Sequence, residues 1–329
     1  MDIEVLGALS VRVNGVSIVP TAPKPRHVLA LLALHADQVV PVSALVEELW
    51  GAKVPRSART TLQTYILQLR ELIETALATT PPAPGPVGAA PGPVGAAPGP
   101  VTGPTAAAAA AAAVAASVAP VAPAPVPVPG PGAVRSGGGG VVRSAKDVLA
   151  TVPGGYRLNS GGGVVDYRAF ETLAGVGYRA MDGEDFAGAA RALAQALALW
   201  SGPALTDITA GLRIGMEARR LEEARLCALD QRIEADLKLG RHRELLPELT
   251  VLVNTHRMHE SLHGQFMLAL HRSGRRGEAL DVYQRLRSTL VAELGLEPSP
   301  ALARLQRSIL MARPEPPAGA GHRLVARTG

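Results

Sequence analysis

Apolar residues recur at steps of three and four along residues 53–73, KVPRSARTTLQTYILQLRELI. This spacing predicts an amphipathic helix that begins at Ser57, runs to about residue 76 and packs one apolar stripe on a core. Ser57 is the expected N-cap, because its hydroxyl can accept an otherwise unpaired amide of the first turn. The expected stripe consists of Ala58, Leu62, Tyr65, Ile66, Leu69, Leu72 and Ile73.

The opposite face of this helix is polar and basic, and no acid occurs between Lys53 and Glu71. Arg, Gln and Thr side chains can bond to base edges, and the amides at a helix N-terminus can hold a phosphate. The pattern therefore predicts a helix that lies in the major groove of DNA. The residues expected to face the groove are Arg56, Arg59, Thr60, Gln63, Thr64 and Gln68, with Leu67 on the same face and Lys53 and Arg70 toward phosphates.

Shorter patterns before this helix complete a helix-turn-helix unit. Apolar and polar residues alternate along residues 3–6, 9–13 and 16–19, and the turn-forming pair Asn14-Gly15 separates the last two of these segments. This pattern predicts a small antiparallel sheet. Residues 26–35 and 42–50 have helical spacing, and Gly51 suits the left-handed position after the second helix. Three helices, the last two joined by a short turn, form the core of such a unit.

The composition changes completely between residues 79 and 140, where PGPVGAA repeats, an alanine tract, a proline-rich run and four glycines follow one another. With almost no charge and no apolar period, this insert is expected to be disordered. Beyond it, residues 147–152 and 156–159 predict a β-hairpin, which would be the wing of a winged helix spanning residues 1–160. Arg143 and Arg157 are its candidate phosphate contacts.

Residues 161–312 are helical in pattern almost throughout, and residues 313–329 are expected to form a disordered tail. Gly240-Arg241 and Gly274-Arg275 stand 34 positions apart, the period of tetratricopeptide helix pairs. Such pairs stack into a concave surface that holds a peptide or another protein. The fold class is thus mainly α, a winged helix-turn-helix followed by a tetratricopeptide-like all-α domain. The expected interlocking positions are Ala189, Leu193, Ala279 and Tyr283.

Composition adds two constraints. Aromatic residues make up only 3% of the 329 residues, so the cores must be built from Leu, Val and Ala. The net charge is +5, but residues 1–80 hold seven basic and seven acidic residues, so the positive character is local. The first residues do not resemble a signal peptide, and no segment is apolar and long enough to cross a bilayer. We expect a cytoplasmic, nucleoid-associated protein with no membrane partner.

A search for chemistry assigns no catalytic, cofactor-binding or metal-binding residue, so the chain is not expected to be an enzyme. The single cysteine, Cys227, excludes a disulfide framework and is expected to be a buried thiol. The glycines at 137–140 lack the Lys-Ser or Lys-Thr of a phosphate loop, and no GxSxG motif occurs. A histidine-bound metalloenzyme ranks last, because no acid or cysteine completes a ligand set with His256, His259, His263 and His271.

Two stretches, LALLALHADQVVPVSALVEELWG and SARTTLQTYILQLREL, followed after the insert by VPGGYRL, resemble the DNA-binding domain of the Streptomyces antibiotic regulatory protein family. The second half resembles the bacterial transcriptional activation domain of the same family, on residues such as FETLAGVGYRA, ALALWSGPALTDI and LHGQFMLALHRSGRRGEALDVYQRLRSTLVAELGLEPSPAL. The likeness covers residues 1–78 and 145–311.

This resemblance implies an OmpR-type winged helix and a pathway-specific activator of antibiotic biosynthesis genes. Its implied partners are double-stranded DNA with direct repeats near promoters, RNA polymerase including its sigma factor, and a second copy of the chain on DNA. Two departures stand out. Pro41 replaces the Ser or Thr that usually opens the second helix, which would cost about 1 kcal/mol, and the insert separates helix from wing.

An alternative from another class stays open at this point. In it the chain is a helical-repeat adaptor whose winged helix binds protein, and affinity for duplex DNA stays at the non-specific, salt-dependent level.

Overall fold

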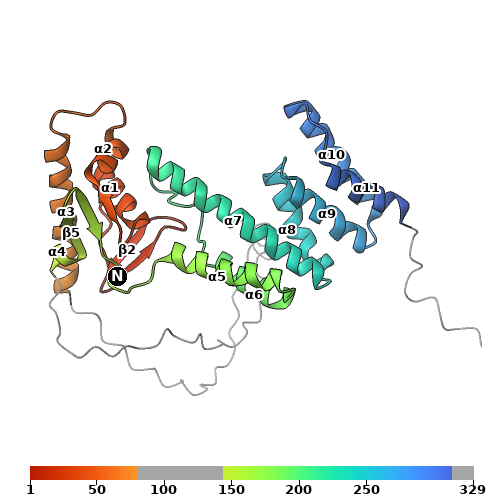
Figure 1. The fold of residues 1–329 in the computed structure, drawn as a ribbon, viewed down its shortest axis with the longest axis horizontal. Coiled ribbons are helices and arrows are strands. Elements are labelled where there is room, and N and C mark those ends of the chain that lie inside the picture. The colour runs from red at the N-terminus through yellow and green to blue at the C-terminus, as the bar shows by residue number, and fades with distance from the viewer. Residues whose placement is uncertain (80–143, 313–329) are drawn as a thin grey trace, which may run out of the picture. The chain divides into compact units, whose positions relative to one another are not determined.

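The computed structural model describes residues 1–79 and 144–312. The expected disordered insert, apart from its first residue, and the expected tail lie outside the described residues. In the described part the fold is mainly helical, with two small antiparallel sheets close to the three N-terminal helices (Figure 1). The predicted fold class is confirmed.

The first sheet joins β1 (Asp2–Glu4), β2 (Ser10–Val13) and β3 (Val16–Ser17) in the order β1-β2-β3. The turn between β2 and β3 has φ of 51° at Asn14 and 81° at Gly15. Two successive positive φ values match the twist of a two-residue hairpin, and Asn and Gly adopt them with little strain. The predicted hairpin is confirmed.

Three helices form the winged-helix core: α1 (Pro23–Leu34), α2 (Val42–Trp50) and α3 (Ala58–Ala78). The pattern predicted the bounds of α2 but placed the start of α1 three residues late. Pro23 and Pro25 fit the first turn of α1, because the backbone amides there make no hydrogen bond within the helix that proline could remove. Between α1 and α2 lies β4 (Val39–Pro41), a strand that the pattern did not predict.

The apolar stripe of α3 faces the core as expected, with one exception. Ala58, Leu62, Ile66, Leu69 and Ile73 are buried, whereas Leu72 is 36% exposed. The inclusion of Leu72 was wrong, because Leu69, Ile73 and Ala76 already occupy the buried face at that level of the helix.

Ser57 stands at the N-cap position of α3, but its side chain makes no capping hydrogen bond. A capping residue normally has an extended backbone that aims its hydroxyl at the amides of the first turn. Ser57 instead has φ −85° and ψ 7°, which continues a turn that begins at Pro55. The predicted hydroxyl cap is therefore wrong.

The wing consists of α4 (Ala145–Val148), β5 (Leu149–Val152) and β6 (Gly155–Leu158), and its sheet has the order β4-β6-β5. The hairpin is confirmed, but the first residues of the predicted strand form a helical turn. The cause is a capping box, in which the carboxylate of Asp147 accepts from the backbone amide of Ser144 at 2.8 Å.

The helical half contains α5 (Asp166–Asp182), α6 (Phe186–Leu197), α7 (Leu212–Lys238), α8 (His242–Thr255), α9 (Glu260–Arg272), α10 (Arg276–Leu294) and α11 (Pro300–Met311). Gly240 and Gly274 follow α7 and α9 with φ of 82° and 83°, as expected for glycines that end helices 34 positions apart. The four predicted interlocking residues, Ala189, Leu193, Ala279 and Tyr283, are all buried.

The hydrophobic cores do not divide at residue 160. One core contains buried residues from Ile3 to Ala228 and thus joins the winged helix to α5, α6 and the first part of α7. A second core contains buried residues from Ile233 to Ile309. The division falls inside α7, which contributes to both cores.

Cys227 is exposed on α7, so the expectation of a buried thiol was wrong. The buried face of α7 passes through Leu221 and Ala228. One residue along a helix turns the side chain by about 100°, which places Cys227 outside that face.

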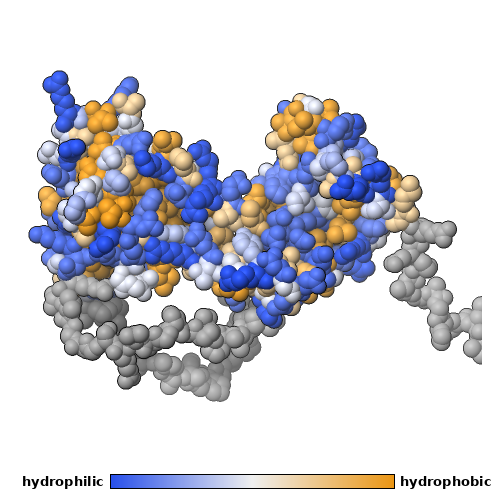
Figure 2. All heavy atoms as spheres, in the orientation of Figure 1, coloured by the Kyte–Doolittle hydropathy of each residue, from blue (hydrophilic) through white to orange (hydrophobic). Residues whose placement is uncertain are grey.

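No helix among residues 1–79 and 144–312 is long and apolar enough to cross a membrane. In the view of Figure 2, hydrophilic residues cover much of the surface, and an apolar patch stands at one end of α10. Near the C-terminal end of α10, Val291, Leu294 and Leu296 are exposed.

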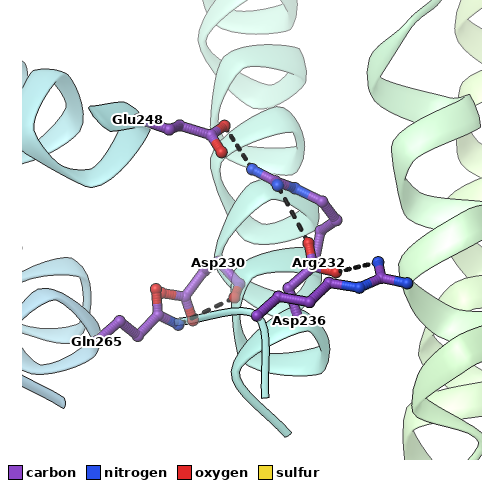
Figure 3. A network of polar contacts seen from close by, with 6 residues as sticks. Asp230, Arg232, Asp236, Glu248 and Gln265 are labelled. Carbon is purple, nitrogen blue, oxygen red and sulfur yellow. Dashed lines mark hydrogen bonds and ion pairs between the residues drawn. The ribbon is translucent and has the colours of Figure 1, made fainter. Parts of the chain in front are cut away.

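A charged network links α7 to α8 (Figure 3). Asp236 is only 6% exposed and accepts hydrogen bonds from Arg232 at 3.2 Å and Arg241 at 2.8 Å. Arg232 also pairs with Glu248 of α8. The carboxylate is thus compensated by two guanidinium groups.

Replacing Asp236 with Asn should lower the free energy of unfolding by about 2 kcal/mol or more, because the guanidinium of Arg232, whose side chain is only 14% exposed, loses a charged partner. Urea unfolding followed by circular dichroism measures the change. Asp281→Asn, at an exposed site on α10, is the matched control and should be nearly neutral. Equal effects of the two substitutions would contradict a stabilising role for the network.

Candidate nucleic-acid interface

The polar side of α3 is a continuous exposed surface, which we call the recognition face. Its members are Arg56, Arg59, Thr60, Gln63, Thr64, Leu67 and Gln68, and all of them are exposed. Leu67 is 57% exposed although it is apolar. Within the described part of the chain, the side chains of Arg56, Arg59, Gln63 and Gln68 make no hydrogen bond or ion pair. The predicted row is therefore present and free to bind another molecule.

A groove of 980 Å³ lies beside the first turns of α3. Its walls come from α2, the α2–α3 connection, α3 and the wing turn. Its residues include Ser43, Glu47, Arg56, Arg59, Gln63 and Gly154. The acid among them, Glu47, pairs with Arg213 of α7 at 2.6 Å, which leaves the two arginines of the groove without an acidic partner.

Arg70 occupies a position that the sequence did not reveal. Its Nε and Nη2 donate to the carbonyl oxygen of Leu149 at 3.1 and 2.8 Å, and Nη2 donates to Thr151 Oγ1 at 2.8 Å. Both acceptors belong to β5. Arg70 therefore fastens the wing to α3, and its expected phosphate contact stays a prediction.

The other predicted phosphate contacts lie outside α3. Lys53 is exposed in the α2–α3 connection. Arg157 is half-buried on β6, the central strand of the wing sheet, where it pairs with Val39 and Ala150. Arg143 lies outside the described residues. Among the predicted phosphate contacts in the described part of the chain, Lys53 is thus the one whose side chain is exposed, since Arg70 and Arg157 are half-buried.

The wing is also attached to α2. Pro41, at the N-cap position, makes no side-chain cap, but the amide of Val42 donates to the carbonyl oxygen of Gly154 at 3.0 Å. Glycine is required next to this contact, because a Cβ on Gly155 would lie 2.2 Å from the carbonyl oxygen of Val40. The carbonyl oxygen of the wing turn therefore accepts from the first amide of α2, one of those that the helix itself leaves unpaired. The wing turn stays attached to α2 despite the insert.

Glu48 of α2 joins the winged helix to α7. Its side chain is 8% exposed, and its carboxylate accepts from the amides of Gly211 and Arg213 at 2.7 Å each and of Ile214 at 3.3 Å. These are unpaired amides at the N-terminus of α7, where the helix dipole also favours a negative charge. The carboxylate thus fixes α2, and with it the helix-turn-helix, to a helix more than 160 residues away in sequence.

A second buried carboxylate, Asp166, joins the first strand region to α5. Its Oδ2 accepts from the amides of Val5 and Leu6 at 2.7 and 2.8 Å, and its Oδ1 accepts from the amide of Tyr167 at 2.7 Å. Burial raises the pKa of Asp166, and the three amides counteract this effect in part. Neither Glu48 nor Asp166 belongs to a recognisable motif, so only the structure reveals them.

Comparison with known proteins places these features in a family. The model of the bacterial transcriptional activator domain matches residues 165–310, and that of the C-terminal domain of transcriptional regulatory proteins matches residues 17–81. Regulatory protein DnrI of Streptomyces peucetius is 44% identical over 314 residues, which cover 95% of this chain and 93% of DnrI. The chain belongs to the Streptomyces antibiotic regulatory protein family. It is a transcriptional regulator.

Other relatives agree with this assignment. Transcriptional regulatory protein MoaR1 of Mycobacterium tuberculosis is 30% identical over 315 residues, which cover 95% of this chain and 80% of MoaR1. The solved structure of Mycobacterium tuberculosis EmbR with a low affinity phosphopeptide matches with a TM-score of 0.69 and 27% identity. The match with EmbR covers 94% of this chain and 64% of the EmbR chain. The family and the fold predicted from the sequence are confirmed.

The contact of Glu48 with α7 can be tested by Glu48→Gln, which removes the negative charge and replaces one of the two accepting oxygens with an NH2 donor that faces the N–H groups of α7. We expect the free energy of unfolding to fall by about 2 kcal/mol, as for the loss of a charged, buried cap. Glu47→Gln is the matched control, since it removes an exposed ion pair worth about 0.5 kcal/mol. Urea titrations compare the two, and a Glu48→Gln loss no larger than that of Glu47→Gln would show that the cap does not hold the unit together.

The wing contact of Arg70 can be tested by Arg70→Lys, which keeps the charge but not the forked geometry. Amide hydrogen exchange in β5 and β6 should become faster by roughly fivefold to tenfold, as for one lost hydrogen bond of about 1 kcal/mol. Arg59→Lys, at an exposed position without partners among the described residues, should leave this exchange unchanged. Unaltered wing protection in Arg70→Lys would mean that the wing does not depend on this guanidinium.

Proposed function

We propose that this regulator activates transcription by reading DNA sequence-specifically with α3. The observation that carries the proposal is the recognition face: arginine, glutamine and threonine side chains are exposed on one side of a helix whose other side is buried. Arg pairs with guanine and Gln with adenine in the major groove, which admits an α-helix. In this proposal Arg56, Arg59, Thr60, Gln63, Thr64 and Gln68 meet base edges.

Phosphate contacts flank the recognition face in the same proposal. Lys53 lies on one side of it, in the α2–α3 connection, and Arg157 lies in the wing. Arg143 and Arg70 complete the proposed set, Arg70 with the part of its guanidinium that the wing does not use. Such contacts fix the register of a protein on the duplex and carry most of the salt dependence.

We further propose that the protein acts at direct repeats near promoters, as two copies head to tail, and that it recruits RNA polymerase, including its sigma factor. Membership of the Streptomyces antibiotic regulatory protein family supports control of secondary-metabolite biosynthesis genes. The exposed apolar side chains of Val291, Leu294 and Leu296 support pairing of protomers through the helical half, since an exposed apolar cluster commonly marks a protein contact.

Two substitutions separate base readout from phosphate binding. Arg59→Ala should weaken binding to the operator by about 1 to 3 kcal/mol and relax specificity at one base position. Lys53→Ala should weaken binding to all sequences alike and reduce the salt slope by about 1. Footprinting across the regulator's own gene neighbourhood first identifies the operator, and fluorescence anisotropy at several salt concentrations then measures both variants on operator and scrambled duplexes.

Arg307→Ala, at an exposed position on α11, is the control and should change neither affinity nor salt slope. If Arg59→Ala and Lys53→Ala both leave operator affinity unchanged, α3 does not lie in the groove. If the unmodified protein binds operator and scrambled duplex equally, the adaptor alternative is favoured instead.

A further inference from the structure

A trough of 480 Å³ lies between α8, α9 and α10 in the helical half, away from the recognition face along the chain. One wall is a face of α8 that ends near Arg257, and the other is a face of α10 from Glu278 to Thr289. These two residues of α10 lie about 16 Å apart at the rise of an α-helix. The trough is therefore long enough for about five residues of an extended chain.

The floor of the trough is apolar and its rim is basic. Val253, Phe266, Val282 and Leu286 line the inner part, and three of these four are buried. The rim carries three exposed cations, Arg257, Arg275 and Arg285, and one exposed acid, Glu278. Glu278 pairs with Arg275 at 2.5 Å, while Arg257 and Arg285 have no ion pair among the described residues.

A buried histidine with an unused nitrogen also lines the trough. His263 is 6% exposed, and its Nδ1 lies 3.1 Å from the carbonyl oxygen of His259. A carbonyl oxygen only accepts, so Nδ1 carries the proton. Within residues 1–79 and 144–312 its Nε2 makes no hydrogen bond, and this atom keeps some contact with solvent although the residue is buried. A ligand group in the trough would supply the missing partner.

We propose that this trough binds an acidic, partly apolar segment of a partner protein. The two guanidinium groups without an ion pair, those of Arg257 and Arg285, would bind carboxylates of the ligand. The apolar floor would bind an apolar side chain, such as leucine, that lies between these carboxylates. The long trough between two helices fits an extended chain better than a compact small molecule. The trough is an interaction site in its own right, independent of the DNA contacts proposed for α3.

The remaining parts of this chain do not supply such a segment. Residues 80–143 contain no acid at all. Residues 313–329 contain the acid Glu315 together with Arg313, Arg323 and Arg327. Both stretches are therefore basic in net charge, and they would be repelled by the arginines of the rim. This charge pattern points to a separate protein as the occupant.

The test uses the full-length protein and a fluorescein-labelled peptide of about eight residues in which aspartate and leucine alternate, a length that spans the trough. A peptide with lysine in place of aspartate is the control probe. We expect the acidic peptide to bind and the basic one not to bind. The double variant Arg257→Glu with Arg285→Glu should weaken binding of the acidic peptide by roughly tenfold or more.

The matched control variant is Arg304→Glu with Arg307→Glu, which makes the same change in net charge at exposed positions of α11. It should bind the acidic peptide as the unmodified protein does. Circular dichroism and operator binding, measured on all variants, show that the fold and the DNA contacts are intact. Failure of the DNA proposal would thus leave this result unaffected.

Three results would overturn the proposal. The first is that the lysine peptide binds as tightly as the acidic peptide. The second is that the two double variants weaken binding of the acidic peptide equally. The third is that sedimentation shows a dimer that only the trough variant abolishes. The last result would assign the trough to a second copy of this chain.

Discussion

The contact on which the rest of the structure depends is the carboxylate of Glu48 at the N-terminus of α7. It satisfies three backbone amides that the helix itself leaves unpaired, and it is supplied by the second helix of the helix-turn-helix. Around it, one hydrophobic core runs from Ile3 to Ala228 without a break at the boundary between the two family domains. The helix-turn-helix is thus held by the helical half, through α1 and α2, as well as by its own small core. Because α7 continues into the second core, it is the element that links the winged helix to the trough between α8, α9 and α10.

The wing shows how a helix-turn-helix tolerates a long insertion between its third helix and its hairpin. Extending a loop adds closure entropy only slowly, so the cost is small if the flanking contacts survive. They do survive: β6 pairs with β4, Arg70 donates to β5, and the carbonyl of Gly154 accepts from Val42. The last contact also satisfies an unpaired amide at the start of α2, where Pro41 provides no side-chain cap. Its acceptor is a residue more than 100 positions away in the sequence.

Local pattern was enough to predict most of the helices and the exposed row on α3, since periodicity records directly which side of an element is buried. It predicted the Asn14-Gly15 turn and the glycine-ended helices for the same reason. It was not enough for β4, because three residues carry no period and Val39–Pro41 forms a strand only by pairing with β6. The roles of Glu48, Asp166 and Arg70 were missed because each depends on a partner distant in sequence. Cys227 and Leu72 were misjudged because an apolar residue at the margin of a stripe can lie on either side of it.

The central claim is that the recognition face of α3 lies in the major groove, and cleavage of DNA from a reagent on that face tests it most directly. Leu67→Cys in a Cys227→Ser background gives one exposed thiol on the recognition face, to which an iron chelate that cuts nearby DNA can be attached. The claim requires strand cuts confined to a few neighbouring positions within each operator repeat. Uniform cutting along the duplex, or cutting no stronger than that of the free reagent, would contradict it.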